Sequence, residues 1–214
     1  MDTDYFEYMD FVRIYVLITF VVALITLDKS KLNNKLLIAV LFVLAITEIS
    51  STLLSYNNVS IGLLYKFSFI LHNTLWLYIL KLNFNNPKSI AVGILLFLVF
   101  SVVNIVRVTE EFDYGIFICG AFIYLSLFIY HSFVELKKEN VQFFTTNNYL
   151  LLCTPIILFV GLSFIFGFKS KNLAQTVVYG NTRLYYFIGY FANSIYYTLI
   201  NIYIYISKKV QYAK

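Results

Sequence analysis

Seven long apolar runs, separated by short polar links, make up most of the chain. They occupy approximately residues 11–27, 36–55, 61–80, 89–106, 115–134, 149–166 and 184–206. A helix rises about 1.5 Å per residue, so about 20 apolar residues cross a hydrocarbon layer about 30 Å thick. The sequence therefore predicts an all-α, polytopic bundle of seven transmembrane helices, with residues 1–214 forming a single transmembrane domain.

The composition favours a membrane protein over a soluble one. Hydrophobic residues make up 60% of the chain and charged residues 13%, whereas soluble domains carry about 25% charged residues. The net charge of +5 does not indicate a nucleic-acid partner, because Lys and Arg lie in the short links between apolar runs. We expect membrane lipid as the partner of the outer surface and no nucleic acid.

The basic residues lie mainly on one side of the predicted bundle. One side carries ten of them: Lys29, Lys31, Lys35, Lys81, Lys88, Lys137, Lys138, Lys208, Lys209 and Lys214. The other side carries four: Arg107, Lys169, Lys171 and Arg183. Cytoplasmic links collect Lys and Arg. We therefore expect the N-terminus outside the cytoplasm and the C-terminus inside.

Glu48, Lys66 and His72 are the clearest ionisable side chains within the apolar runs. Such side chains are costly in a bilayer and usually face a bundle interior or a cavity. From the predicted outer helix ends, Glu48 lies roughly 10 Å deep, Lys66 roughly 8 Å and His72 roughly 16 Å. We expect Glu48 and Lys66 to meet across the antiparallel second and third helices. Two interpretations remain open for this pair, a ligand-facing site and a purely structural ion pair.

Polar residues also form a stripe along the seventh run, at helical spacing. The stripe consists of Tyr186, Tyr190, Asn193, Tyr197 and Asn201. We predict one cavity that opens outward between the second, third and seventh helices. The candidate ligand-binding residues are Glu48, Lys66, His72, Asn73, Tyr190, Asn193 and Tyr197. The alternative is that the uncharged polar groups only join helices, as such hydrogen bonds do in membrane bundles.

Four further residues are expected to be structural. Arg13 should extend to the interface or pair with the acidic N-terminus, and His131 and Glu135 should lie at the inner interface with their charges toward water. Trp76 should serve packing. No metal site is expected, because the two histidines lie in different helices, and no cofactor is expected.

Enzyme and receptor signatures are absent from the sequence. It contains neither a GxSxG elbow nor an HExxH helix. The seventh run has no lysine that could hold retinal and no NPxxY, and the third run ends LYILKL without a DRY-type triplet. We expect no catalytic residues and favour a role other than that of an enzyme.

Four segments of the chain carry a resemblance to a known group. They are AITEISSTLLS, LLYKFSFILHNTLWLYILKL, LLCTPIILFVGLSFIFGF and LYYFIGYFANSIYYTLINIYIYI. With its Thr47-Glu48 pair and its aromatic third, sixth and seventh runs, the chain resembles small seven-helix membrane proteins of Bacteroidota. The resemblance implies a bacterial inner-membrane protein that works beside a signalling kinase.

Three functions are compatible with these features. The leading hypothesis is a receptor-like or regulatory module that senses a small or lipidic ligand in an outward-facing cavity and signals to a cytoplasmic protein. The second is a small transporter or ion-conducting subunit that uses Glu48 and Lys66. The third is an intramembrane enzyme that modifies lipid. The absence of an internal repeat and of paired broken helices favours the first over the second.

Overall fold

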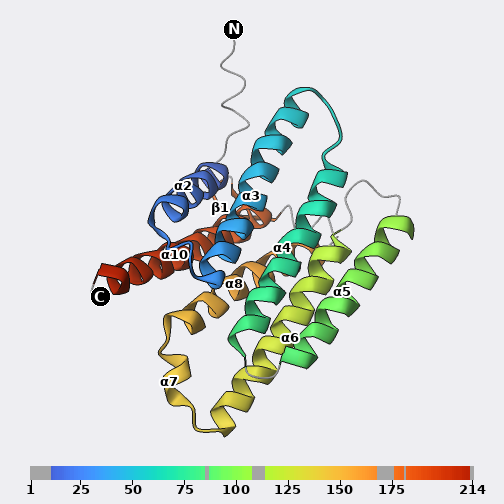
Figure 1. Ribbon diagram of the computed structural model, residues 1–214. Helices are drawn as coiled ribbons and strands as arrows, with labels where there is room; N and C mark the ends of the chain where they lie inside the picture. Colours follow the sequence, from blue (N-terminus) through green and yellow to red (C-terminus); the bar gives the residue numbers. More distant parts are fainter. Residues whose placement is uncertain (1–10, 85–86, 108–113, 168–175, 181, 213–214) are drawn as a thin grey trace.

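The computed structural model describes residues 11–84, 87–107, 114–167, 176–180 and 182–212 (Figure 1). The elements are α2 (Phe11–Thr26), α3 (Leu32–Tyr56), α4 (Gly62–Asn83), α5 (Pro87–Arg107), α6 (Gly115–Lys137), α7 (Val141–Phe144), α8 (Asn147–Gly167), β1 (Val177–Tyr179), β2 (Thr182–Arg183) and α10 (Leu184–Tyr212). Each predicted apolar run corresponds to one long helix. The prediction of a helical bundle is therefore confirmed.

Five helices, α3, α4, α5, α6 and α8, are long and apolar enough to cross a membrane. Helix α2 is apolar but has 16 residues. Helix α10 has 29 residues, and its many Tyr and Asn residues lower its hydropathy. Among the described residues, length and composition alone thus identify five spans, fewer than the seven expected.

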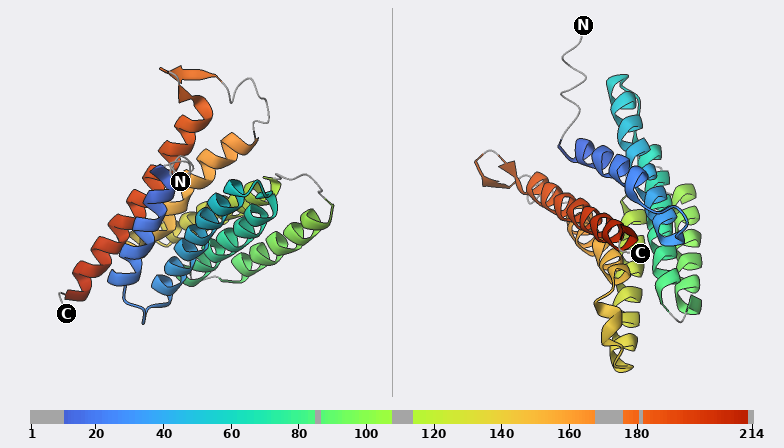
Figure 2. Two further views of the ribbon diagram at one scale, coloured as in Figure 1. Left: turned by 90° about the horizontal axis from the view of Figure 1, so that it is seen from above. Right: turned by 60° about the vertical axis from the view of Figure 1, so that its left-hand side comes forward.

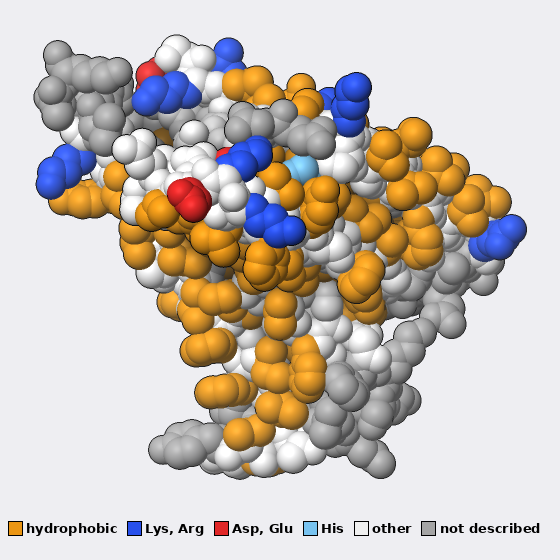
Figure 3. Space-filling model, turned by 90° about the horizontal axis from the view of Figure 1, so that it is seen from below, with side chains coloured by type: hydrophobic (Ala, Val, Ile, Leu, Met, Phe, Trp, Pro, Cys, Tyr) orange, Lys and Arg blue, Asp and Glu red, His pale blue; other side chains and the backbone are white. Residues whose placement is uncertain are grey.

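The outer surface of the helices is strongly apolar. Four residues of α5 are each at least 60% exposed: Leu95, Leu96, Val102 and Val106. In the view from below, charged side chains lie in the upper half of the picture, and hydrophobic side chains extend over much of the remaining described surface (Figure 3). Soluble monomers rarely expose continuous apolar surface of this kind, so these helix faces suit lipid.

Six helices form a ring through successive contacts. Helix α2 packs on α3, α3 on α4, α4 on α6, α6 on α8, α8 on α10, and α10 returns to α2. Helix α5 packs against α4 and α6, and α4 also contacts α8. In Figure 2, α10 and α2 are inclined to α3 and α4.

A short hairpin precedes α10 and departs from the all-α prediction. Strands β1 and β2 pair in antiparallel fashion, with Val177 opposite Arg183. Gly180 lies between them with φ of 56°, a conformation that glycine adopts without strain. The hairpin falls in a link that we expected to be a simple loop, so it adds to the bundle without changing it.

Polar side chains join the helices at the other end of the ring. Asn33 and Asn83 exchange amide hydrogen bonds of 3.0 and 3.2 Å between α3 and α4. The Tyr203 hydroxyl donates to Asn34 Oδ1 at 2.7 Å and joins α10 to α3. The Nδ2 atom of Asn201 donates to Thr19 Oγ1 at 3.0 Å and joins α10 to α2. For Asn201, the interpretation of polar groups as links between helices is therefore correct.

The expectation that His131 and Glu135 reach toward water is wrong. They are 2% and 3% exposed. Glu135 accepts hydrogen bonds from Lys138 Nζ at 2.9 Å and from Asn140 Nδ2 at 2.8 Å, and so holds the turn that ends α6. His131 Nε2 bonds to Ser89 Oγ at 2.8 Å, and its ring stacks on Phe84. The turn after α6 buries Glu135, and contacts with Phe84 and Ser89 bury His131; the pattern of apolar runs reveals neither.

Candidate ligand-binding site

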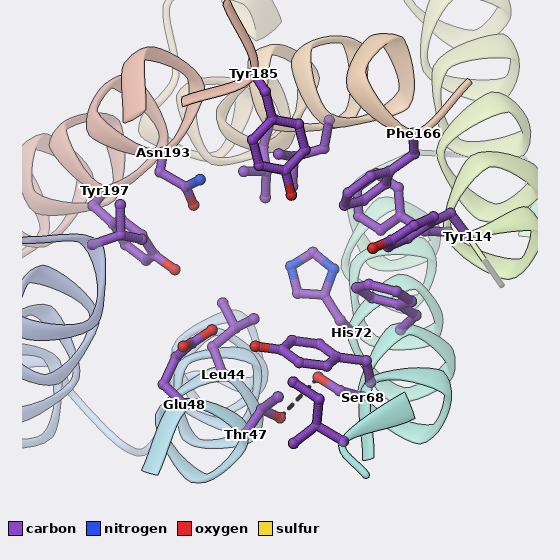
Figure 4. Close-up of a pocket in the computed structure, with 17 residues that line it drawn as sticks. Leu44, Thr47, Glu48, Ser68, His72, Tyr114, Phe166, Tyr185, Asn193 and Tyr197 are labelled. Carbon is purple, nitrogen blue, oxygen red and sulfur yellow. Dashed lines mark hydrogen bonds between the residues drawn. The ribbon is translucent and has the colours of Figure 1, made fainter. Parts of the chain in front are cut away.

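A cavity of about 330 Å³ lies inside the six-helix ring. It lies near the first residues of α2, α4, α6 and α10 and the last residues of α8, as Val12, Tyr65, Phe117, Phe166 and Tyr185 line it. Figure 4 shows these helices surrounding the space, with side chains directed inward. Its size is within the range of small-molecule sites, roughly 300–1,000 Å³.

Helix α3 contributes a carboxylate to the wall. Glu48 lines the cavity, and its Oε2 atom accepts a hydrogen bond from Arg13 Nε at 3.0 Å. The two side chains are 20% and 19% exposed, so the ion pair is partly shielded from solvent. Just beside Glu48, the hydroxyls of Thr47 and Ser68 hydrogen bond at 2.8 Å and join α3 to α4 (Figure 4). Among the described residues that line the cavity, Glu48 is the one with a formal charge.

The floor of the cavity is a group of three hydrogen-bonded aromatic side chains. Trp76 Nε1 donates to His72 Nε2 and to the Tyr196 oxygen, both at 3.2 Å. The indole nitrogen is only a donor, so His72 Nε2 must be an acceptor, and a neutral His72 ring carries its proton on Nδ1. His72 lines the cavity (Figure 4). The His72 ring at the floor therefore carries an N–H donor on Nδ1.

Below this floor the interior is filled. Trp76, Leu77, Tyr124, Phe159 and Tyr196 are each fully buried. Phe159 packs edge-on against His72 with ring centroids 5.8 Å apart, and Tyr124 packs against Phe159 at 5.1 Å. The cavity is thus a blind pocket within the described residues.

Helix α10 supplies two further polar groups. Asn193 and Tyr197 line the cavity from successive turns. Asn193 Nδ2 donates to the Gly189 carbonyl at 2.8 Å, which leaves its oxygen and its second N–H available to a ligand. Figure 4 shows the Asn193 amide and the Tyr197 hydroxyl directed into the space.

An aromatic wall faces these polar groups across the cavity. Tyr114 and Phe166 stack with centroids 4.0 Å apart. Phe117 meets Phe166 edge-on at 5.3 Å, and Phe69 meets Phe117 at 5.2 Å. These rings come from α4, the start of α6 and the end of α8, so helix packing fixes their positions.

The structure brings together four of the seven predicted site residues. Glu48, His72, Asn193 and Tyr197 line the cavity, while Lys66, Asn73 and Tyr190 do not. The described ion pair of Glu48 is with Arg13, whereas we expected Lys66. Arg13 therefore does more than extend to the interface.

Helix geometry explains why Lys66 is not at the cavity. Residues two apart differ by about 200° around a helix, and Ser68 faces Thr47 on α3. Lys66 thus faces away from α3. Lys66 lies one heptad before Asn73, so Lys66 and Asn73 share a face of α4. Asn73 packs against Gly120 of α6, so this face is directed toward α6. Tyr190 is 36% exposed on the surface of α10.

The pattern of polar residues in the sequence does not indicate the aromatic wall. Tyr65, Ser68, Phe69 and His72 occupy positions i, i+3, i+4 and i+7 of α4, so the sequence does contain the signal for one common face. The contributions of Tyr114, Phe166 and Tyr185 depend on how distant helices meet, which spacing along one helix does not encode.

Comparisons of the chain with protein-family models, with curated proteins and with solved structures find no match.

Proposed function

We propose that the chain is a receptor-like membrane protein that binds a small or lipidic ligand in the cavity and signals to a cytoplasmic partner. The observation that carries the proposal is a blind pocket inside a ring of apolar helices, with polar groups directed into it. Sites for small molecules typically combine apolar walls with a few placed polar groups. The cavity has this composition.

We infer that α2 and α10 cross the membrane with the five longer apolar helices and complete a bundle of seven. Both pack within the ring, α2 between α3 and α10, and α10 between α2 and α8. Arg13 and Glu48, on α2 and α3, pair beside the cavity. A partner of this kind offsets the cost of placing a carboxylate among apolar helices.

The cavity then opens away from the cytoplasm. It lies at the end of the ring opposite the lysine-bearing helix ends, which include Lys81 in the last turn of α4 and Lys137 in the last turn of α6. Cytoplasmic links collect such residues. The resemblance to small membrane proteins of Bacteroidota supports a bacterial inner membrane as the location and a signalling protein as the partner.

Helix α10 is the element best suited to transmit binding. It lines the cavity with Asn193 and Tyr197 and then, towards its C-terminal end, bonds to other helices through Asn201 and Tyr203. A ligand that moves the first part of α10 would therefore strain the hydrogen bonds of Asn201 and Tyr203, which lie further along the helix.

The filled floor favours binding over ion conduction. A channel needs a continuous path, and among the described residues the buried Trp76, Phe159 and Tyr196 block one. The purified chain in proteoliposomes should therefore conduct no Na⁺, K⁺, Cl⁻ or H⁺ above the level of empty vesicles. Flux carried by the chain alone would contradict the receptor proposal.

A cavity-filling variant tests the proposal directly. The wild-type chain should co-purify with a bound molecule, detected by mass spectrometry of an extract, and Leu162→Trp should displace it. Leu95→Trp is the matched control, because Leu95 is 62% exposed on α5. Spin labels on Lys137→Cys and Lys209→Cys, after replacement of Cys119 and Cys153, should report a changed distance only in the cavity variant. Identical extracts and distances in both variants would contradict the proposal.

A further inference from the structure

The cavity has two chemically different sides. Hydrogen-bond acceptors gather on the side of α3 and α10, where the Glu48 carboxylate, the Asn193 oxygen and the Tyr197 hydroxyl lie (Figure 4). On the side of α4, α6 and α8 the lining is aromatic and includes Phe69, Phe117 and Phe166. A ligand that satisfies both sides must be polar at one end and apolar at the other.

The acceptor side favours a cation. Among the described residues that line the cavity, none is Lys or Arg. Arg13 pairs with Glu48 without being part of the lining. A carboxylate has about four acceptor sites, so it can serve a protein cation and a ligand together. An anionic head group would instead meet the carboxylate of Glu48.

The aromatic rings also favour a cation over an anion. Their faces carry the negative part of the ring quadrupole and attract ammonium groups within about 6 Å. Tyr197, whose side chain is 2% exposed, lies next to Glu48 on the wall and adds both a ring and a hydroxyl oxygen. The neutral His72 ring adds no competing positive charge at the floor, since its Nε2 accepts the Trp76 proton.

We propose that the cavity binds an organic amine, with its ammonium group at Glu48, Asn193 and Tyr197 and its aromatic or alkyl body against the opposite aromatic wall. The proposal rests on the proposed ligand-binding function and names the chemical class of the ligand. The His72 ring lies between the two sides (Figure 4), and its Nδ1–H suits a hydrogen-bond acceptor in the middle of such a ligand.

Three probes with one common body separate the head-group chemistries. They are 4-phenylbutylamine, 4-phenylbutanol and 4-phenylbutyrate, added to the full chain in nanodiscs of phosphatidylcholine. Binding is measured by calorimetry, with empty nanodiscs to subtract partition into lipid, and by fluorescence of Trp76, the single tryptophan of the chain. The amine should bind at least about tenfold more tightly than the alcohol, since hydrogen bonds to charged groups are the stronger class. The carboxylate should show no saturable binding.

Variants assign the effect to the acceptor side. Glu48→Gln should weaken binding of the amine by about 10- to 100-fold and leave the alcohol unchanged. Glu135→Gln is the matched control, because it also removes a carboxylate from an ion pair but lies far from the cavity in the last turn of α6. Asn193→Leu removes one acceptor without breaking an ion pair, so it keeps the test informative if Glu48→Gln misfolds.

Two results would overturn the proposal. Equal binding of amine and alcohol, unaffected by Glu48→Gln and Asn193→Leu, would show a cavity that does not select amines. Absence of saturable binding for the amine would also overturn the proposal. In either case the co-purification result with Leu162→Trp would still decide separately whether the cavity is a ligand site.

Discussion

Arg13 and Glu48 form an ion pair between α2 and α3 at the cavity wall. Removal of one partner leaves the other charge half-buried and uncompensated, which is costlier than removal of both. Arg13→Gln and Glu48→Gln should each lower the melting temperature in detergent, and the double variant should recover part of the loss. The interaction free energy between the two substitutions, measured in this double-mutant cycle, should be about 0.5–3 kcal/mol.

The same cycle with Lys66→Met in place of Arg13→Gln is the control. Its effects should add to those of Glu48→Gln, because Lys66 faces away from α3 and does not line the cavity. Coupling of Glu48 to Lys66 in place of Arg13 would contradict the described arrangement.

Tyr196 offers a second test at the scale of single residues. Its hydroxyl accepts a hydrogen bond from Trp76 at 3.2 Å, so Tyr196→Phe should destabilise the chain by about 1 kcal/mol. Because Trp76 is the single tryptophan, its emission should shift as well. Tyr205→Phe on the same helix is the control, since Tyr205 is 67% exposed and should change neither quantity. An unshifted emission in Tyr196→Phe would argue against the floor as described.

Helices α4 and α6 approach each other closely at Gly120. A Cβ atom built there would lie 2.5 Å from Asn73 Cγ, and small residues allow such close approach between membrane helices. Gly120→Ala should therefore destabilise the bundle by about 1–3 kcal/mol, as overpacking does. Gly189→Ala, where the nearest atom is Ile165 Cδ1 at 3.9 Å, should be tolerated in the same thermal assay. Equal stability of the two variants would contradict the tight contact.

Elements were easier to predict than contacts between them. Apolar runs of about 20 residues indicate helices directly, because backbone groups in lipid must be satisfied within the helix. The polar stripe on α10 likewise placed Asn193 and Tyr197 on one face, and both line the cavity. The partner of Glu48 was missed because depth alone does not fix the direction of a side chain around its helix. Arg13 was expected at the interface or in a pair with the acidic N-terminus, and the packing of α2 on α3 brings it to Glu48.

In the part of the chain that the structure describes, six helices form a ring with α5 packed against it, a blind cavity at one end and polar joints at the other. The proposed function as a receptor requires that the cavity face outward while the lysine-rich ends face the cytoplasm. The orientation of the bundle in the membrane and access to the cavity from outside are therefore the two properties to test, and one labelling experiment addresses both.

That experiment is reaction of single cysteines with a membrane-impermeant thiol reagent in intact cells, in a chain whose Cys119 and Cys153 have been replaced. Asn58→Cys, in the link between α3 and α4, and Asn193→Cys, in the cavity, should react. Asn140→Cys, in the link between α6 and α7, should react only after the cells are permeabilised. Reaction of Asn140→Cys in intact cells, with Asn58→Cys and Asn193→Cys protected, would contradict an outward-facing cavity.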